Sequence, residues 1–131
     1  MKAFHYVNVM LIIIFLVAIC WLEERQVSKS LEAVQDRAFE IERLVEDKTS
    51  LLDSEVAIKV DNLEYRWSKD EVNLCYLVNH KSMQEIGVEI SKLKAYIATD
   101  DIDAFKVSLS QLQLFCRTYL HFMGASIHNV M

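Results

Sequence analysis

Hydrophobic residues form one long run near the start of the chain. From Ala3 to Leu22, 20 residues pass without Asp, Glu, Lys or Arg, and a helix of that length crosses a hydrocarbon core of about 30 Å. Tyr6 near one end and Trp21 at the other suit the two membrane interfaces, where amphipathic rings are favoured. The pattern predicts a transmembrane helix, with residues 4–22 in contact with membrane lipid.

After this run, apolar residues recur at helical spacing among charged ones. The first stripe either continues the membrane helix or begins a new helix near Ser28, and the charged residues 46–50 interrupt it. The stripes of four predicted helices are, in chain order, Leu31, Val34, Ala38, Ile41 and Val45; Val56, Val60, Leu63, Trp67, Leu74 and Leu77; Ile86, Ile90, Leu93 and Ile97; and Ile102, Phe105, Leu109, Leu112, Cys116 and Tyr119.

Capping signals give the boundaries of the last two helices. Ser82 and Glu85 form a capping box, in which each side chain bonds a free backbone N–H of the other residue, so the third helix is predicted to begin at Met83. The acidic stretch 99–101 suits the positive end of the fourth helix. We expect the tail to fray from Gly124 onward.

Short polar connections between helices of this length make sequential neighbours antiparallel. The prediction is an all-α chain, in which the N-terminal transmembrane helix is followed by an antiparallel three- to four-helix bundle. The absence of proline and the presence of only two glycines agree with it. A rival is a tetratricopeptide-like stack, suggested by the spacing of Tyr96, Asp100, Ala104 and Leu109, although such a stack needs about three units and no second copy is visible.

Charge is distributed unevenly along the chain. All 19 acidic residues but only 13 of the 14 basic ones follow Leu22, so the part outside the membrane carries a formal charge of 13 − 19 = −6. An acidic domain argues against nucleic acid and against anionic lipid as partners. Lys2 precedes the apolar run and Glu23 and Glu24 follow it, which predicts a cytoplasmic N-terminus and an extracytoplasmic domain.

The anchor has three interpretations. No small-x-small cleavage site follows the apolar run, which argues against a cleaved signal peptide. Val17 to Cys20 resemble a lipobox, making Cys20 a candidate for lipidation, but Ile19 stands where a small residue is required. The preferred division is a transmembrane signal anchor over residues 1–24 and an extracytoplasmic helical-bundle domain over residues 25–131.

Apolar, turn and helix-end positions along the whole chain carry a family resemblance. The positions are Trp67, the pair Asn79 and His80, Glu85 and Ile86, Ile90, Leu93, the pair Tyr96 and Ile97, Asp100 or Asp101, Ala104, Leu109 and Leu112. On these, the chain resembles the domain of unknown function 4363, a group of short proteins from Gram-positive, often spore-forming bacteria. The resemblance implies a membrane-anchored helical domain with no established activity, and it supplies no catalytic residues.

Two cysteines and two histidines are the candidate zinc ligands. His80 follows Cys75 by five residues, and His121 follows Cys116 by the same interval. Residues five apart on a helix point about 140° away from each other, which argues against a metal site. The plainer interpretation is two half-buried thiols and two helix-end histidines. A disulfide between Cys75 and Cys116 is chemically permitted outside the cell.

Four further residues form a candidate interaction or ligand surface: Trp67, Arg66, His80 and Tyr96. The Trp67 ring beside Arg66 is either a binding platform or, since it lies on the apolar stripe, a core residue. His80 is either a turn residue bonding a helix end or a general base, and no nucleophile is identifiable near it.

Polar residues elsewhere also have two interpretations each. Asn8 inside the apolar run either contacts another membrane helix or reaches the headgroups. Asp100, Asp101 and Asp103 either bind a cation or mark the start of a helix.

Together these features predict a non-enzymatic, single-pass membrane protein without a cofactor, whose helical domain binds another protein or a second copy of itself at the membrane surface. One alternative is a small-ligand sensor, which requires a polar-lined pocket near Trp67 and His80. A second is a tetratricopeptide-like adaptor. A third is an enzyme dependent on zinc.

Overall fold

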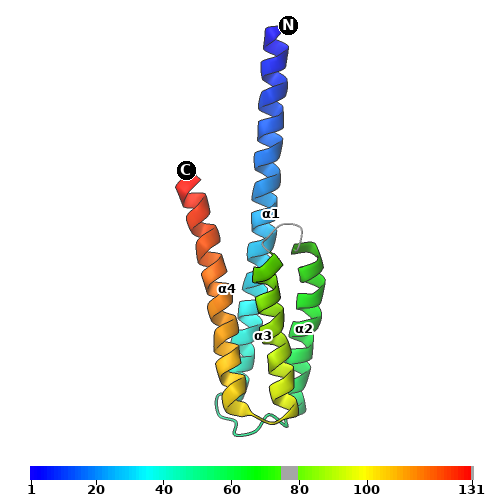
Figure 1. Ribbon diagram of the computed structural model, residues 1–131, viewed down its shortest axis with the longest axis vertical. Coiled ribbons are helices and arrows are strands. Elements are labelled where there is room, and N and C mark those ends of the chain that lie inside the picture. The colour runs from blue at the N-terminus through cyan, green and yellow to red at the C-terminus, as the bar shows by residue number, and fades with distance from the viewer. Residues whose placement is uncertain (75–79, 131) are drawn as a thin grey trace.

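The computed structural model describes residues 1–74 and 80–130, with side chains for 1–74 and 81–122. These residues form α1 (Lys2–Val45), α2 (Ser54–Leu74), α3 (His80–Ala98) and α4 (Ile102–Val130), shown in Figure 1. The predicted all-α fold is confirmed.

Helix α1 is one continuous rod of 44 residues. Its first half is exposed and apolar, and it is the one described helix long and apolar enough to cross a membrane. Its second half presents a buried stripe from Val27 to Val45. Proline and glycine, the usual causes of a break, are absent from it. Of the two possibilities left open by the sequence, the structure therefore has the continuous helix.

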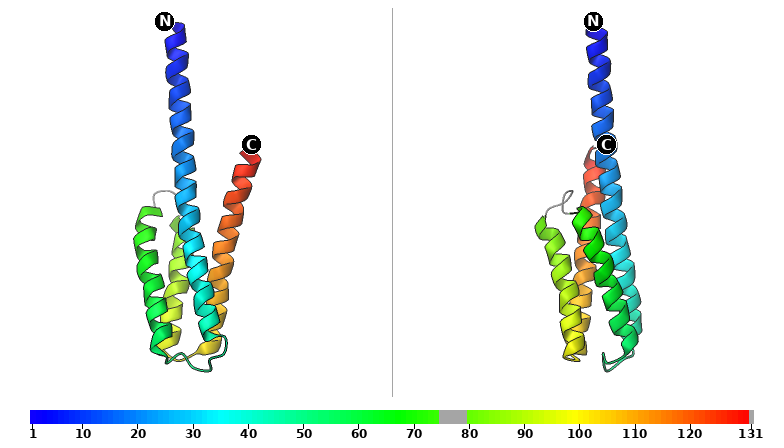
Figure 2. Two further views of the ribbon diagram at one scale, coloured as in Figure 1. Left: turned by 180° about the vertical axis from the view of Figure 1, so that it is seen from behind. Right: turned by 90° about the vertical axis from the view of Figure 1, so that its right-hand side faces the viewer.

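The second half of α1 and the other three helices make an antiparallel four-helix bundle. Each helix packs against the next in the chain, and α4 returns to pack against α1. Figures 1 and 2 show the chain running down α1, up α2, down α3 and up α4. A stack of helical hairpins would leave the first and last helices apart, so the tetratricopeptide-like alternative does not describe this fold.

Apolar stripes from all four helices fill the bundle, as their spacing predicts. The buried members include Leu31, Val34, Ala38, Ile41, Val56, Val60, Leu63, Trp67, Leu74, Ile86, Ile90, Leu93, Phe105, Leu109, Leu112 and Cys116. Burying each large apolar side chain contributes about 1.5–3 kcal/mol before chain entropy is subtracted, so this core is the main source of stability.

Polar side chains at the helix interfaces fix the register between neighbours. The Gln113 side chain of α4 donates a hydrogen bond from Nε2 to Oε2 of Glu42 on α1, at 2.8 Å. Glu89 of α3, itself buried, accepts a hydrogen bond from Ser108 Oγ on α4 at 2.7 Å. Gln113 and Glu89 are buried. Because a buried polar group is costly unless it is paired, each contact favours the observed register of its two helices.

Two boundary predictions were wrong. Helix α3 begins at His80 and not at Met83, so Ser82 lies inside the helix and is not its N-cap. Met83 is fully buried in the core. Because the helix begins three residues earlier, Met83 is already held in a helical turn. Helix α4 continues through Gly124 to Val130, because a single glycine costs only about 1 kcal/mol in a helix. Leu77, predicted for the second helix, lies outside the described residues.

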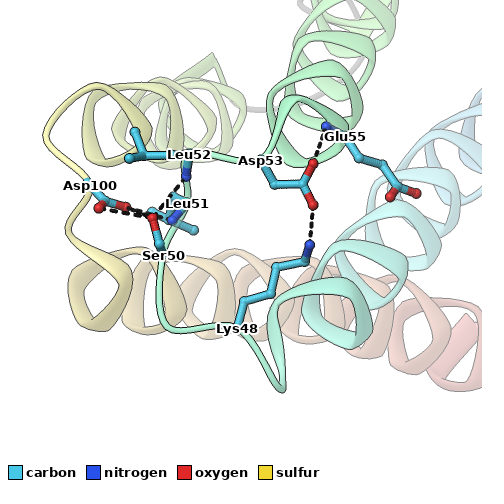
Figure 3. Close-up of polar contacts among 7 residues, drawn as sticks. All are labelled: Lys48, Ser50, Leu51, Leu52, Asp53, Glu55 and Asp100. Carbon is cyan, nitrogen blue, oxygen red and sulfur yellow. Dashed lines mark hydrogen bonds and ion pairs between the residues drawn. The ribbon is translucent and has the colours of Figure 1, made fainter.

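The two connections at the end of the bundle far from the apolar segment are tied together by Asp100 (Figure 3). Its carboxylate accepts a hydrogen bond from the Leu51 backbone N–H at 2.6 Å, and both its oxygens lie 3.0 Å from Ser50 Oγ. Asp100 has a φ of 52°, in the left-handed region that aspartate tolerates better than most residues. Leu51 is thereby held fully buried beneath the bundle.

Two further carboxylates accept hydrogen bonds from backbone N–H groups in the first turns of α2 and α4. Asp53 accepts a hydrogen bond from the Glu55 backbone N–H at the start of α2, and Asp101 accepts one from Ala104 at the start of α4. Lys48 pairs with Asp53, and its hydrogen bond holds the pKa of that carboxyl below its usual value. The helix-start interpretation of the acidic residues therefore describes Asp101. No group of three or more metal-ligating side chains occurs among the described residues.

Candidate functional site

Of the four residues predicted as an interaction surface, the three whose side chains are described do not lie together. Trp67 is only 2% exposed and belongs to the core. Arg66, one position along α2, is exposed on the outside of the bundle, and the half-buried Tyr96 packs near the opposite end of α3. The side chain of His80 is outside the described part of the chain. Trp67 is therefore a core residue, and its ring is not an accessible binding platform.

The Trp67 indole packs against a small residue of α3. A Cβ placed on Gly87 would lie 3.4 Å from Trp67 Nε1. That indole N–H is buried and has no hydrogen-bond acceptor among the described atoms. Glycine at this position gives the indole room, but the space is wide enough for a methyl group at ordinary contact distance.

Gly87→Ala is therefore expected to stabilise the domain. Alanine improves helix propensity by about 0.8–1.0 kcal/mol, which corresponds to a rise in Tm of about 4–8 °C. Thermal unfolding of the full chain in detergent micelles, followed by circular dichroism, measures it. Gly87→Val is the control, because its branched side chain crowds the indole. A fall in Tm for Gly87→Ala would contradict the packing described here.

An open depression between α1 and α2 is the clearest candidate binding surface. Its volume is about 500 Å³, and it is lined by Arg37, Asn62, Tyr65, Arg66, Lys69 and Asp70. We call this set the basic groove. Three of its side chains are cations and one is a carboxylate, whereas the residues after Leu22 together carry −6. The basic groove is therefore a local reversal of charge on an acidic domain.

One aromatic ring lies among the charged groups of the basic groove. Tyr65 is 63% exposed, and Lys69 Nζ lies 4.5 Å from the centroid of its ring, a cation–π contact. Arg66 Nε lies 3.5 Å from Asp70 Oδ2, which makes an ion pair but no hydrogen bond. Arg37 comes across from α1 and makes no ion pair with the described residues. The guanidinium groups of Arg37 and Arg66 can therefore turn toward an added anion, to which arginine binds with two parallel hydrogen bonds.

Sequence reasoning found Arg66 but missed Tyr65 and Arg37. A signal for Tyr65 was present, since Tyr65 and Lys69 are four residues apart and so lie on one helix face. No local signal could find Arg37, because it comes from another helix.

The candidate zinc ligands and disulfide cysteines are only partly described. Cys116 is a buried free thiol, and burial raises its pKa to about 12, which leaves it protonated and inert. His121 is exposed, whereas Cys75 lies outside the described residues. Cys20 and Asn8 are exposed on the apolar half of α1, where lipidation and helix contact stay predictions.

The fold thus defines a class of protein: a four-helix domain carried on a single N-terminal apolar helix that continues into it. The chain belongs to the family described as Domain of unknown function (DUF4363), whose model matches residues 22–130. The match covers the whole bundle, and the resemblance noted from the sequence is confirmed. No curated protein and no solved structure matches the chain.

Proposed function

We propose that this protein is a non-enzymatic, single-pass membrane protein whose extracytoplasmic domain binds an acidic segment of another protein through the basic groove. The apolar part of α1 is the anchor, the N-terminus is cytoplasmic, and the bundle stands on the outer surface. The observation that carries the proposal is the convergence of Arg37, Arg66, Lys69 and the exposed Tyr65 on an otherwise acidic domain.

The anchor is supported by the form of α1. The residues that would lie in the bilayer are exposed, and the same helix enters the core from Val27 onward. At the junction, the Arg25 guanidinium lies 5.5 Å from the centroid of the Trp21 ring, a pairing suited to the headgroup region. A continuous helix makes the anchor a rigid extension of the domain.

The composition of the basic groove favours a protein partner. Tyrosine and arginine are the residues most enriched where proteins bind one another, because each combines apolar area with a directed polar group. A partner segment carrying Asp or Glu would gain hydrogen bonds from the arginines, and the acidic remainder of the domain would repel it elsewhere. The small-ligand alternative required a polar-lined pocket near Trp67 and His80. Trp67 is only 2% exposed and belongs to the core, and the side chain of His80 lies outside the described part of the chain.

The test is crosslinking in intact cells with a membrane-impermeant, amine-reactive reagent, followed by purification through a C-terminal tag. Lys69 lies in the basic groove and supplies the reacting amine. The double variant Arg37→Glu/Arg66→Glu reverses the charge of the groove, and Arg43→Glu reverses a charge elsewhere on α1. Circular dichroism checks that both variants fold.

We expect a protein adduct that is retained in Arg43→Glu and lost in the double variant, and that weakens as salt is raised, because exposed charges are screened. An adduct equally strong in all three proteins would overturn the role of the basic groove. Labelling without any protein adduct would overturn partner binding. An unlabelled domain in intact cells would overturn the orientation.

A further inference from the structure

Helix α4 extends beyond the bundle on the side of the apolar segment. Figure 1 shows α4 passing the ends of α2 and α3 on the side from which the first half of α1 projects. Among the residues of α4 whose side chains are described, Tyr119 and Leu120 are the last that pack against the core, both half-buried, and Phe122 is 64% exposed. Residues 118–130 form the last part of this helix, and we call them the distal part of α4.

The register between α1 and α4 gives the height that this part reaches. From the contact between Gln113 and Glu42, Val130 lies 17 residues further along α4, and Arg25 lies 17 residues back along α1. Both helices rise about 1.5 Å per residue and run antiparallel, so the end of α4 comes to about the level of Arg25. The apolar run ends at Leu22, only three residues away.

The two helices diverge at this end, as Figure 2 shows. The backbone of α4 therefore moves away from that of α1 toward its end, and the distal part approaches the plane of the membrane surface at a separate point. The headgroup region adds about 5–7 Å to each side of the hydrocarbon core, which is enough to meet a helix ending at that level.

The composition of residues 118–130 suits that position. They contain no Asp, Glu, Lys or Arg. Their larger members are Tyr119, Leu120, Phe122, Met123, Ile127 and Val130, together with His121, His128 and Asn129. The ends of α2 and α3 that α4 passes are charged, since α2 carries Asp70 and Glu71 and α3 carries Lys81 and Glu85. An uncharged helix end loses little on entering the headgroup region, whereas charged ends remain in water.

We infer that the distal part of α4 is a second membrane contact, which inserts into the headgroup region of the bilayer that holds α1. The inference rests on the membrane anchor of the proposed function. Two separate contacts fix the rotation of the bundle about the α1 axis. The basic groove is then held at a constant angle to the membrane surface instead of turning freely on one rod.

Photo-crosslinking to lipid tests this inference. The full chain is reconstituted into phosphatidylcholine vesicles with p-benzoylphenylalanine replacing one residue at a time, and lipid adducts are detected by intact mass. Val130 probes the distal part of α4. Phe15 in the apolar segment probes the anchor, and Val107, 67% exposed at the far end of α4, is the negative control. Ile127→Asp places a charge near the Val130 probe, and Val107→Asp is its matched control.

We expect lipid adducts from positions 15 and 130 and none from position 107. Ile127→Asp should reduce the adduct at position 130 to the level of position 107, while Val107→Asp leaves it unchanged. Adducts from position 15 alone, or a crosslink from position 130 to a second protein chain, would overturn the inference and leave the anchor intact. The lack of an adduct from position 15 would instead overturn the anchor.

Discussion

Trp67→Ala is expected to lower the free energy of unfolding by about 3–5 kcal/mol, the usual cost of truncating a large buried aromatic residue. Trp67 is 2% exposed and joins the stripe of α2 to α3 at Gly87. Removing the ring leaves a cavity between these two helices that their backbones can close only in part. Chemical denaturation of the full chain in detergent micelles, followed by circular dichroism, measures the loss.

Trp67→Phe separates packing from polarity. Phenylalanine keeps much of the ring volume and removes an indole N–H that has no acceptor among the described atoms, so its loss should be well below that of alanine. Tyr65→Ala on the exposed side of α2 is the matched control. It should change stability by less than about 0.5 kcal/mol while weakening the partner adduct. Equal stability of Trp67→Ala and wild type would contradict the core position of Trp67.

Asp100→Ala is expected to destabilise the bundle by about 2–4 kcal/mol, through two separate losses. The partly buried Leu51 N–H and the Ser50 hydroxyl lose their acceptor. Alanine must also adopt a φ of 52°, which the aspartate side chain makes easier by bonding locally. The connection between α1 and α2 then loses its tie to the connection between α3 and α4, visible in Figure 3. The denaturant midpoint reports the change.

Two further substitutions of Asp100 separate the cost of the lost acceptor from the cost of the strained backbone. Asp100→Asn keeps an acceptor oxygen and tolerance of the left-handed region, so it should be the mildest. Asp100→Gly relieves the backbone but removes the acceptor, and should fall between asparagine and alanine. Asp103→Ala, in the first turn of α4, removes a favourable helix-dipole interaction worth only about 0.3–1 kcal/mol. Similar losses for Asp100→Ala and Asp103→Ala would show that the tie contributes nothing.

Hydrophobic spacing alone was enough to predict the helices and their buried faces. The stripe from Leu31 to Val45 and the stripe of α4 from Phe105 to Cys116 are buried as their spacing requires. This follows because an apolar face repeating every 3.6 residues is a local property of the chain. Charge-free length likewise identified the apolar segment before Leu22. The boundaries at His80 and Val130 were predicted less well, since packing of Met83 and the lack of a strong helix breaker decided them.

Tertiary structure decided everything that depends on two segments meeting. Asp100 accepts a hydrogen bond from a backbone group 49 residues away, and Arg37 of α1 and Arg66 of α2 line the same groove. The height reached by α4 depends on its register against α1, in which Gln113 pairs with Glu42. The spacing of residues along one helix predicts which face of that helix is polar. It does not predict which residues of another helix will lie next to that face. Those choices follow from how the four apolar stripes pack together, and they decide where the basic groove lies and which helix end extends furthest on the side of the apolar segment.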